Sequence, residues 1–307
     1  MSTTASAPAP SATGSAVPGP AAPDSAAAAV AVTQPVLAPA RKPGGRTIKT
    51  YGPPLAVFAG IVAGWYALAG YLESVGRTTV LPSPTRIVVE AFFPTDGGTP
   101  ITADLIRALG LSVTVALIGL GISIVLGIAW AVVMLQARWI ERSLFPYAVI
   151  LQCVPILALV PLIGTSLGYS FESRVLVCVL ISLFPMVSNT LFGLQSVDKS
   201  QRELFQLQGA SRWTVLTKLQ FPNAMPTIFA GLRISAGLSV VGAIVGDFFF
   251  RRGQPGLGIL INNYASRVQT PELFASILTA ALLGVVIFLV FGWLTKLAVG
   301  RWYEPAS

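Results

Sequence analysis

Residues 108–137 read ALGLSVTVALIGLGISIVLGIAWAVVMLQA, thirty consecutive positions without a charged side chain. Arg107 and Arg138 stand immediately on either side of this stretch. An α-helix crosses the hydrocarbon core of a bilayer in about 20 apolar residues, and it makes its backbone hydrogen bonds within the segment. The stretch therefore predicts a membrane-spanning helix with a cation at each end.

The rest of the chain also has the composition of a protein solvated by lipid. Of its 307 residues, 54% are hydrophobic and only 10% are charged, whereas a soluble domain carries about 25% charged residues. Further charge-free stretches cover residues 143–171, 175–197 and 273–295. We therefore expect an all-α membrane protein with six transmembrane helices, at residues 53–72, 110–136, 144–168, 174–194, 227–249 and 274–298.

Proline and glycine inside the predicted spans indicate how the helices are shaped and packed. Pro155 and Pro161 in the third span and Pro185 in the fourth are expected to kink their helices, because proline lacks a backbone N–H. Glycines in the second and fifth spans are expected to allow close helix contacts; they are Gly119, Gly121, Gly127, Gly231, Gly237, Gly242 and Gly246.

The first 45 residues differ from the remainder. They consist mainly of Ala, Pro, Ser and Thr, and this composition predicts a disordered cytoplasmic tail. We expect no signal peptide, because no basic region precedes a compact apolar segment before residue 53. Residues 46–307 are then expected to form one six-helix transmembrane domain, with a cytoplasmic loop at residues 200–226.

The distribution of Lys and Arg predicts the orientation of the chain. With the N-terminus inside, the cytoplasmic segments contain twelve of the 20 basic residues, the outer segments seven, and one, Arg233, lies within a span. The cytoplasmic segments of membrane proteins carry an excess of Lys and Arg. The count therefore favours this arrangement, with both termini cytoplasmic in a bacterial inner membrane. It also explains the net charge of +8 without a nucleic-acid partner.

Side chains that carry chemistry are few. There is no histidine, and the two cysteines, Cys153 and Cys178, both fall inside predicted spans. Histidine-based catalytic pairs, histidine-ligated metals and a disulfide between exposed loops are therefore excluded. The sequence also lacks the G-x-x-x-x-G-K-[ST] phosphate loop. We expect no enzyme activity, no cofactor and no metal, and any ATP hydrolysis must come from another subunit.

A polar, basic segment interrupts the apolar chain between the fourth and fifth spans. Residues 203–226 read ELFQLQGASRWTVLTKLQFPNAMP. Ser200 and Glu203 have the spacing of a capping box, which predicts a helix start. Gly209 permits a sharp turn, and a second short helix is expected to end at Pro222, before Pro226 opens the fifth span. Two interpretations fit: an amphipathic helix on the lipid headgroups, and a docking site for a soluble partner.

The spacing of this segment resembles the EAA loop of ATP-binding-cassette (ABC) importer permeases. The matching positions are Glu203, Gly209-Ala210, Leu219, Phe221-Pro222 and Pro226, whereas Leu204 and Phe205 replace the two alanines usual in the family. The resemblance covers about residues 55–303. Within the family, the chain resembles the branch of permeases for taurine, alkanesulfonates and nitrate. Its other motifs are Leu81–Pro84, Pro155, Ala158, Pro161-Leu162, Gly168, Gly231–Arg233, Asp247 and Gly256–Gly258.

This resemblance implies an ABC importer type I permease fold with a cytoplasmic coupling helix. It implies three kinds of partner besides membrane lipid: cytoplasmic ABC ATPase subunits, a second permease copy in a homodimer, and an extracytoplasmic substrate-binding protein. It implies transport of a small anionic or heterocyclic organic solute. The docking of the ATPase is assigned by resemblance to Glu203, Leu204, Phe205, Gly209, Ala210, Leu219, Phe221 and Pro222.

A few polar side chains inside the spans are candidates for the translocation path: Gln152, Asn189, Arg233, Ser239 and Asp247. Arg233 and Asp247 are fourteen residues apart, about 21 Å along a helix, so they cannot pair with each other. Either both extend to opposite interfaces, or each has a functional role. The alternative function is an ion-coupled secondary transporter, for which buried acids or histidines near the midplane are expected. An intramembrane enzyme would require histidine or a second buried acid.

Overall fold

The computed structural model describes residues 46–93, 100–250 and 254–300. The predicted disordered tail, residues 1–45, lies outside the described residues. The chain divides after Pro54 into two compact units. The described part of the first unit is the beginning of helix α1 (Arg46–Ser74), and the second unit contains the rest of that helix and all the others.

The described residues form helices and no strands, which confirms the all-α prediction. After α1, the elements are α2 (Pro84–Phe92), α3 (Thr102–Leu135), α4 (Arg138–Cys153), α5 (Ile156–Leu167), α6 (Phe171–Gln195), α7 (Lys199–Leu207), α8 (Arg212–Val215), the π-helix η2 (Leu216–Gln220), α9 (Phe221–Phe249), α10 (Leu257–Ser266) and α11 (Thr270–Val299).

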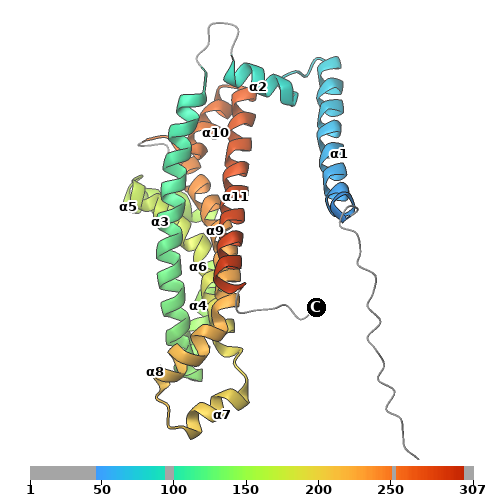
Figure 1. The fold of residues 1–307 in the computed structure, drawn as a ribbon. Helices are drawn as coiled ribbons and strands as arrows, with labels where there is room; N and C mark the ends of the chain where they lie inside the picture. Colours follow the sequence, from blue (N-terminus) through green and yellow to red (C-terminus); the bar gives the residue numbers. More distant parts are fainter. Residues whose placement is uncertain (1–45, 94–99, 251–253, 301–307) are drawn as a thin grey trace, which may run out of the picture. The chain divides into compact units, whose positions relative to one another are not determined.

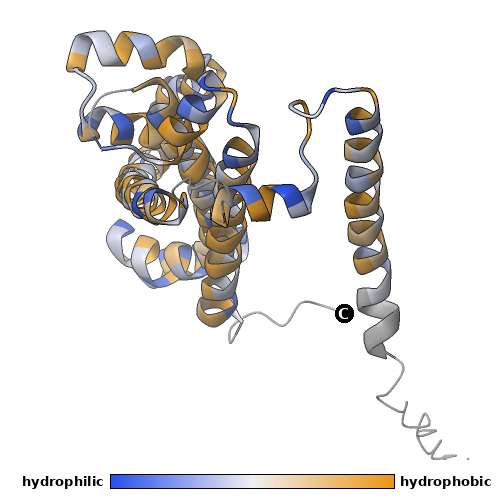
Figure 2. Ribbon diagram, turned by 90° about the horizontal axis from the view of Figure 1, so that it is seen from above, coloured by the Kyte–Doolittle hydropathy of each residue, from blue (hydrophilic) through white to orange (hydrophobic). Residues whose placement is uncertain are grey.

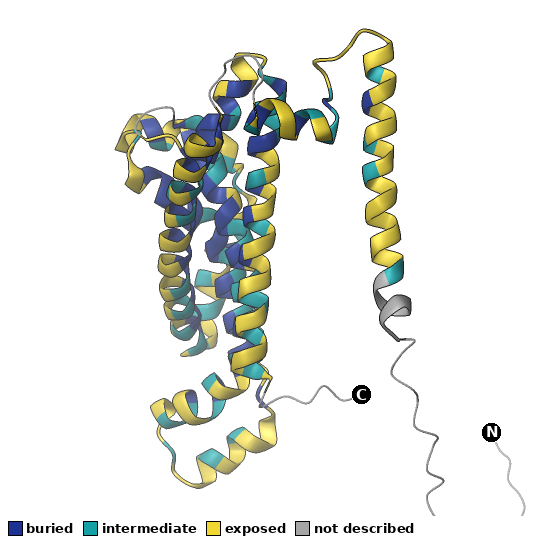
Figure 3. Cartoon of the chain, turned by 45° about the horizontal axis from the view of Figure 1, so that its top comes forward, coloured by how far each residue is buried: buried dark blue, intermediate teal, exposed yellow. Residues whose placement is uncertain are grey.

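The bundle is built from α3, α6, α9 and α11, with α7 and α8 at one end and α10 at the other (Figure 1). Hydrophobic residues predominate around the long helices (Figure 2). Buried residues line the inside of the bundle, whereas the outward faces are exposed (Figure 3). A helix that is apolar on all sides fits a lipid environment, in which the outward face needs no polar residues.

Small and hydroxyl residues bring α3, α6 and α9 together. A Cβ at Gly119 of α3 or Gly242 of α9 would collide with Cys178 of α6, so these glycines allow the three helices to meet around the buried cysteine, as predicted. Gly121 and Gly237 would accept a Cβ without contact, so their predicted packing role is wrong. The Ser182 hydroxyl lies 2.7 Å from that of Ser123, and Ser235 donates to the Ser182 carbonyl at 2.8 Å. Such contacts are typical of helix packing in membranes.

Among the described residues, five helices are long and apolar enough to cross a membrane, and the number is six only if one bent pair of helices is counted as a span. The bent pair is the predicted third span, which forms α4 and α5 at an angle of 93°. The prediction of one kinked helix at residues 144–168 is therefore wrong. Val154 is extended before Pro155, because proline disfavours the α conformation of the preceding residue, whereas Pro146 and Pro161 remain inside helices.

The predicted fifth span begins much earlier than expected. Its helix runs without interruption from Arg212 to Phe249, through α8, η2 and α9. Pro222 therefore does not end a helix, and Pro226 does not begin one. The π-turn shifts the hydrogen-bond register, since the Phe221 amide donates to the carbonyl of Leu216, five residues earlier. Turns of this kind are rare, and those that occur are frequently at functional sites.

Candidate docking surface and intramembrane polar groups

Helix α7 begins two residues earlier than the capping-box prediction requires. Its first residue is Lys199 and its N-cap is Asp198, without a side-chain capping hydrogen bond, so the predicted Ser200–Glu203 capping box is wrong. Ser200 is already inside the helix, where its hydroxyl cannot serve as the cap. The Glu203 carboxylate instead lies 3.6 Å from the Lys199 ammonium, one turn away on the exposed surface.

Arg202 connects α7 to the membrane bundle. Its guanidinium donates to the carbonyls of Leu194 and Gln195, at 3.2 and 3.1 Å, where α6 ends. A cation is favourable at this position, because the last carbonyls of a helix carry partial negative charge. The loop is therefore attached at its beginning to the end of α6.

Gly209 lies at the turn between the two halves of the loop, as predicted. Its φ angle of +69° is in the left-handed region, which glycine adopts without steric cost. The amide of Ala210 donates to the Phe205 carbonyl and the amide of Gly209 to the Gln206 carbonyl, both at 3.0 Å. This pair of bonds is the Schellman motif, which satisfies the free carbonyls at the end of a helix.

Ser211 starts the second half of the loop. Its hydroxyl accepts from the Thr214 amide at 3.2 Å and so caps α8. Two of the predicted motif residues, Leu219 and Phe221, are half-buried, and Phe221 packs against the cluster that contains Leu216 and Ile228. Pro222 is exposed. This part of the motif therefore anchors the loop to α9.

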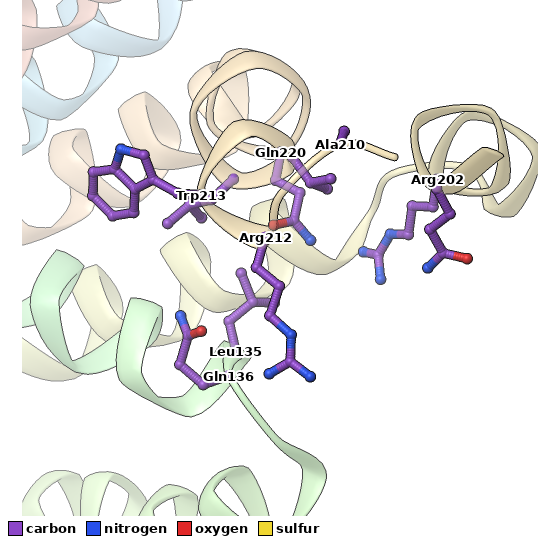
Figure 4. A pocket seen from close by; sticks show the side chains of 10 residues that line it. Leu135, Gln136, Arg202, Ala210, Arg212, Trp213 and Gln220 are labelled. Carbon is purple, nitrogen blue, oxygen red and sulfur yellow. The ribbon is translucent and has the colours of Figure 1, made fainter. Parts of the chain in front are cut away.

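The outer side of the loop exposes large apolar side chains. Leu204, Leu207 and Trp213 are 54%, 87% and 70% exposed. Figure 4 shows a neighbouring hollow between the end of α3 and the loop, lined by Arg202, Arg212, Trp213 and Gln136 among others, with no acidic residue in its lining. Exposed aromatic and arginine side chains, here Trp213 and Arg212, are enriched at protein-binding surfaces.

The predicted path residues do not form one site. Gln152 is exposed on α4. The Asn189 amide donates to the Pro185 carbonyl of its own helix at 2.8 Å, and the buried Ser239 hydroxyl donates to Ala236 at 2.8 Å. Asn189 and Ser239 thus satisfy their polar groups locally, where α6 packs against α9.

Arg233 contacts helix α11 rather than an acidic residue. Its guanidinium carbon lies 3.8 Å from the ring centroid of Phe288, and Gly292 leaves space beside it. A cation over an aromatic face is electrostatically favourable, more so where water is excluded. Among the described residues it makes no ion pair.

Asp247 has a partner that the sequence did not indicate. Arg174 Nη1 of α6 lies 2.8 Å from Asp247 Oδ1, and each side chain is only 4% exposed. Arg174 is the first residue of the predicted fourth span, and this position gave no sign that its side chain is buried. Of the two alternatives for Asp247, extension to the interface is therefore wrong.

Comparisons with known proteins agree with this fold. Residues 119–302 match the family model of the binding-protein-dependent transport system inner membrane component. The formylaminopyrimidine transport permease of Halalkalibacterium halodurans is 35% identical over 70% of this chain and 82% of its own length. The riboflavin transport permease of Chloroflexus aurantiacus is 36% identical over 54% of this chain and 60% of its own length.

A Bacillus subtilis permease named for the transport of aliphatic sulfonates is 30% identical over 83% of this chain and 86% of its own length. A solved structure titled as an amino acid ABC transporter with histidines matches with a TM-score of 0.51 and 18% identity, over 65% of this chain and 94% of that one. The predicted resemblance and the permease fold are thus confirmed.

Proposed function

Because this chain belongs to the family of binding-protein-dependent transport system inner membrane components, we propose that it is the translocation subunit of an ABC importer, coupled to a separate cytoplasmic ATPase. The observation that carries the proposal is the loop at residues 199–226. It is attached to the end of α6 by Arg202 and is continuous with α9, and between these attachments it exposes Leu204, Leu207 and Trp213.

The ATPase-docking residues are proposed in two groups. Phe221, which packs against the cluster of Leu216 and Ile228, and the half-buried Leu219 form the group that holds the loop on the bundle. Glu203, Leu204 and Phe205 present the surface that contacts the ATPase, and the Gly209-Ala210 turn sets the angle between the two halves. Closure of an ATPase dimer on ATP binding would displace two such loops, and rigid-body motion of the attached helices would alternate access to the path.

The proposed assembly contains two permease copies, two ATPase subunits and an extracytoplasmic binding protein. The loop is then cytoplasmic, as are both termini, which is the orientation favoured by the Lys and Arg distribution. The chain has no phosphate loop of its own, so the chemistry of ATP hydrolysis is assigned to the partner and no enzyme activity to this chain.

The proposed solute is a small anionic or heterocyclic organic molecule. The relatives are named for formylaminopyrimidine, riboflavin and aliphatic sulfonates, and these names support the class without selecting one member. Gln152, Asn189, Arg233, Ser239 and Asp247 offer no common polar pocket in the single chain, which favours recognition by the binding protein.

The alternative, an ion-coupled secondary transporter, is less well supported. Such a carrier needs an acid that binds and releases an ion near the midplane. Asp247 lies near the end of α9, in an ion pair with Arg174.

Reconstitution tests the proposal. The chain is co-expressed with its ATPase, purified as a complex and incorporated into liposomes with the binding protein. Uptake of riboflavin, a formylaminopyrimidine, an alkanesulfonate and nitrate is measured with and without ATP. We expect a stable complex and ATP-dependent uptake of one of these solutes. Uptake by the chain alone, driven by a proton gradient, would refute the proposal.

A further inference from the structure

The buried Asp247 carboxylate of α9 joins α6 and α9 to the beginning of α10, and Ser112 of α3 adds a third helix. Its Oδ1 pairs with Arg174 of α6, and its Oδ2 accepts from the amides of Gly258 and Ile259 at 3.0 and 3.3 Å. The hydroxyl of Ser112 on α3 accepts from the Leu257 amide at 3.0 Å. The first free amides of α10 are thus held by side chains of α9 and α3. A negative charge at this end of a helix is favourable.

Arg174 makes the complementary contacts at the end of α9. Its guanidinium donates to the carbonyl of Phe250 at 3.4 Å and to that of Gln254 at 3.0 Å. These carbonyls belong to the residue that follows α9 and to the segment that leads into α10. One buried ion pair therefore fixes both the end of one helix and the start of the next.

Two glycines let α10 approach closely enough for these bonds. A Cβ at Gly256 would collide with the Asp247 carboxylate, and a Cβ at Gly258 would collide with the backbone of α9 at Ile244 and Phe248. On the same side, the Asn262 amide donates to the Phe248 carbonyl at 3.2 Å. Helix α10 is thus held directly on the backbone of α9.

The helix that contains Asp247 also carries the loop at residues 199–226, called the docking loop below, at its other end. The run from Arg212 to Phe249 contains 38 residues, which at about 1.5 Å per residue is about 57 Å of helix. Asp247 stands near one end of this run, and the loop segment Arg212–Gln220 forms the other. A displacement of the docking loop would therefore also displace α9, the helix that holds α10.

We propose that the Arg174–Asp247 ion pair, with Ser112, is a clamp that makes α10 move as one body with α9 and α6, so that the end of the bundle opposite the docking loop responds to that loop. Arg174 and Asp247 are positioning residues in this proposal and do not contact the solute. The direction of coupling rests on the proposed function, whereas the clamp can be tested by itself.

The test measures distances between spin labels on exposed residues. One label is placed on Asn263 of α10 and one on Val241 of α9, in a Cys153→Ser background that removes the exposed native thiol. The complex with the ATPase is studied in lipid nanodiscs, without nucleotide and after trapping with ATP and vanadate. We expect the same narrow distance distribution in both states. A second sample, labelled only at Asn263, reports the distance between the two copies, which we expect to change.

Asp247→Asn removes the charge but keeps the size and an acceptor oxygen for the α10 amides. We expect the Asn263–Val241 distribution to broaden, and the nucleotide-dependent change between copies to disappear while ATP hydrolysis continues. The matched control is Glu90→Gln, which breaks the exposed Arg86–Glu90 pair of α2 and should change neither distance. Unaltered distances in Asp247→Asn, or a wild-type Asn263–Val241 distance that depends on nucleotide, would overturn the clamp.

Two further samples keep the test decisive. If Asp247→Asn does not fold, Ser112→Ala removes only the acceptor of the Leu257 amide, and it should broaden the Asn263–Val241 distribution to a smaller extent; no broadening counts against the clamp. If the chain binds no ATPase, the proposed function fails. The clamp can then still be tested in the isolated chain. There too, the Asn263–Val241 distance distribution must be broader in Asp247→Asn than in the wild type.

Discussion

The Ala210 amide donates to the Phe205 carbonyl across Gly209, at 3.0 Å. This bond and the left-handed Gly209 set the angle between α7 and α8. The turn is exposed, and a Cβ at Gly209 would contact no other atom, so its only steric requirement is the backbone conformation.

Gly209→Val is expected to weaken ATPase association without loss of membrane insertion. A branched side chain in the left-handed region costs about 1–2 kcal/mol, which corresponds to a factor of about 5–30 in an equilibrium constant. The measurement is the amount of ATPase subunit that co-purifies with the permease as the concentration of the ATPase subunit is raised. Gly76→Val is the matched control, because Gly76 also has a positive φ angle, +77°, with no neighbour near its Cβ position, but lies outside the loop. Equal effects of the two substitutions would contradict a docking role for the turn.

Glu203→Ala is expected to lower substrate-stimulated ATP hydrolysis at normal protein abundance. The Lys199–Glu203 contact is exposed, and exposed ion pairs contribute only about 0–1 kcal/mol to stability, so the fold should not respond. Arg138→Ala, at the connection between α3 and α4, should leave hydrolysis near the wild-type rate. If Glu203→Ala hydrolyses and transports normally as well, its carboxylate does not contact the ATPase.

Gly119→Leu is expected to destabilise the bundle. The new side chain would meet Cys178 at the contact of α3 with α6, and overpacking of this kind costs about 1–3 kcal/mol. Thermal unfolding in detergent should show a lower midpoint. Gly121→Leu lies two residues away, where a Cβ meets no neighbour, and should unfold like the wild type. A normal midpoint for Gly119→Leu would show that the helices separate without cost.

Deletion of residues 2–40 is expected to leave membrane insertion and transport near normal. Their composition of Ala, Pro, Ser and Thr offers neither an apolar core nor a span. The measurement compares the abundance, complex formation and uptake of the shortened and full-length chains. Loss of complex formation would identify the tail as a docking arm.

The spans and the loop turn could be predicted because their causes are local. A charge-free stretch such as residues 108–137 must avoid water wherever it folds, and α3 occupies it as Thr102–Leu135. Gly209 similarly occupies a turn that demands a positive φ angle at that residue.

The effect of each proline depended on more than its position in the sequence. Pro155 separates α4 from α5 by a 93° bend, whereas Pro222 and Pro226 lie within one continuous helix. The missing N–H is the same in every case. What differs is the surrounding backbone: Val154 becomes extended, but a π-turn precedes Pro222 and keeps the chain helical.

The sequence by itself determined the membrane class, the positions of the long apolar stretches and the polar loop that carries the family resemblance, because hydropathy and backbone preference act over a few residues. Only the tertiary structure decided the partner of Asp247, since Arg174 is 73 positions earlier in the chain, on another helix. Their pairing depends on how closely α6, α9 and α10 approach, which the buried Cys178 contacts and Gly258 allow. Contacts of this kind are set by packing across the bundle, and no local pattern of residues encodes them.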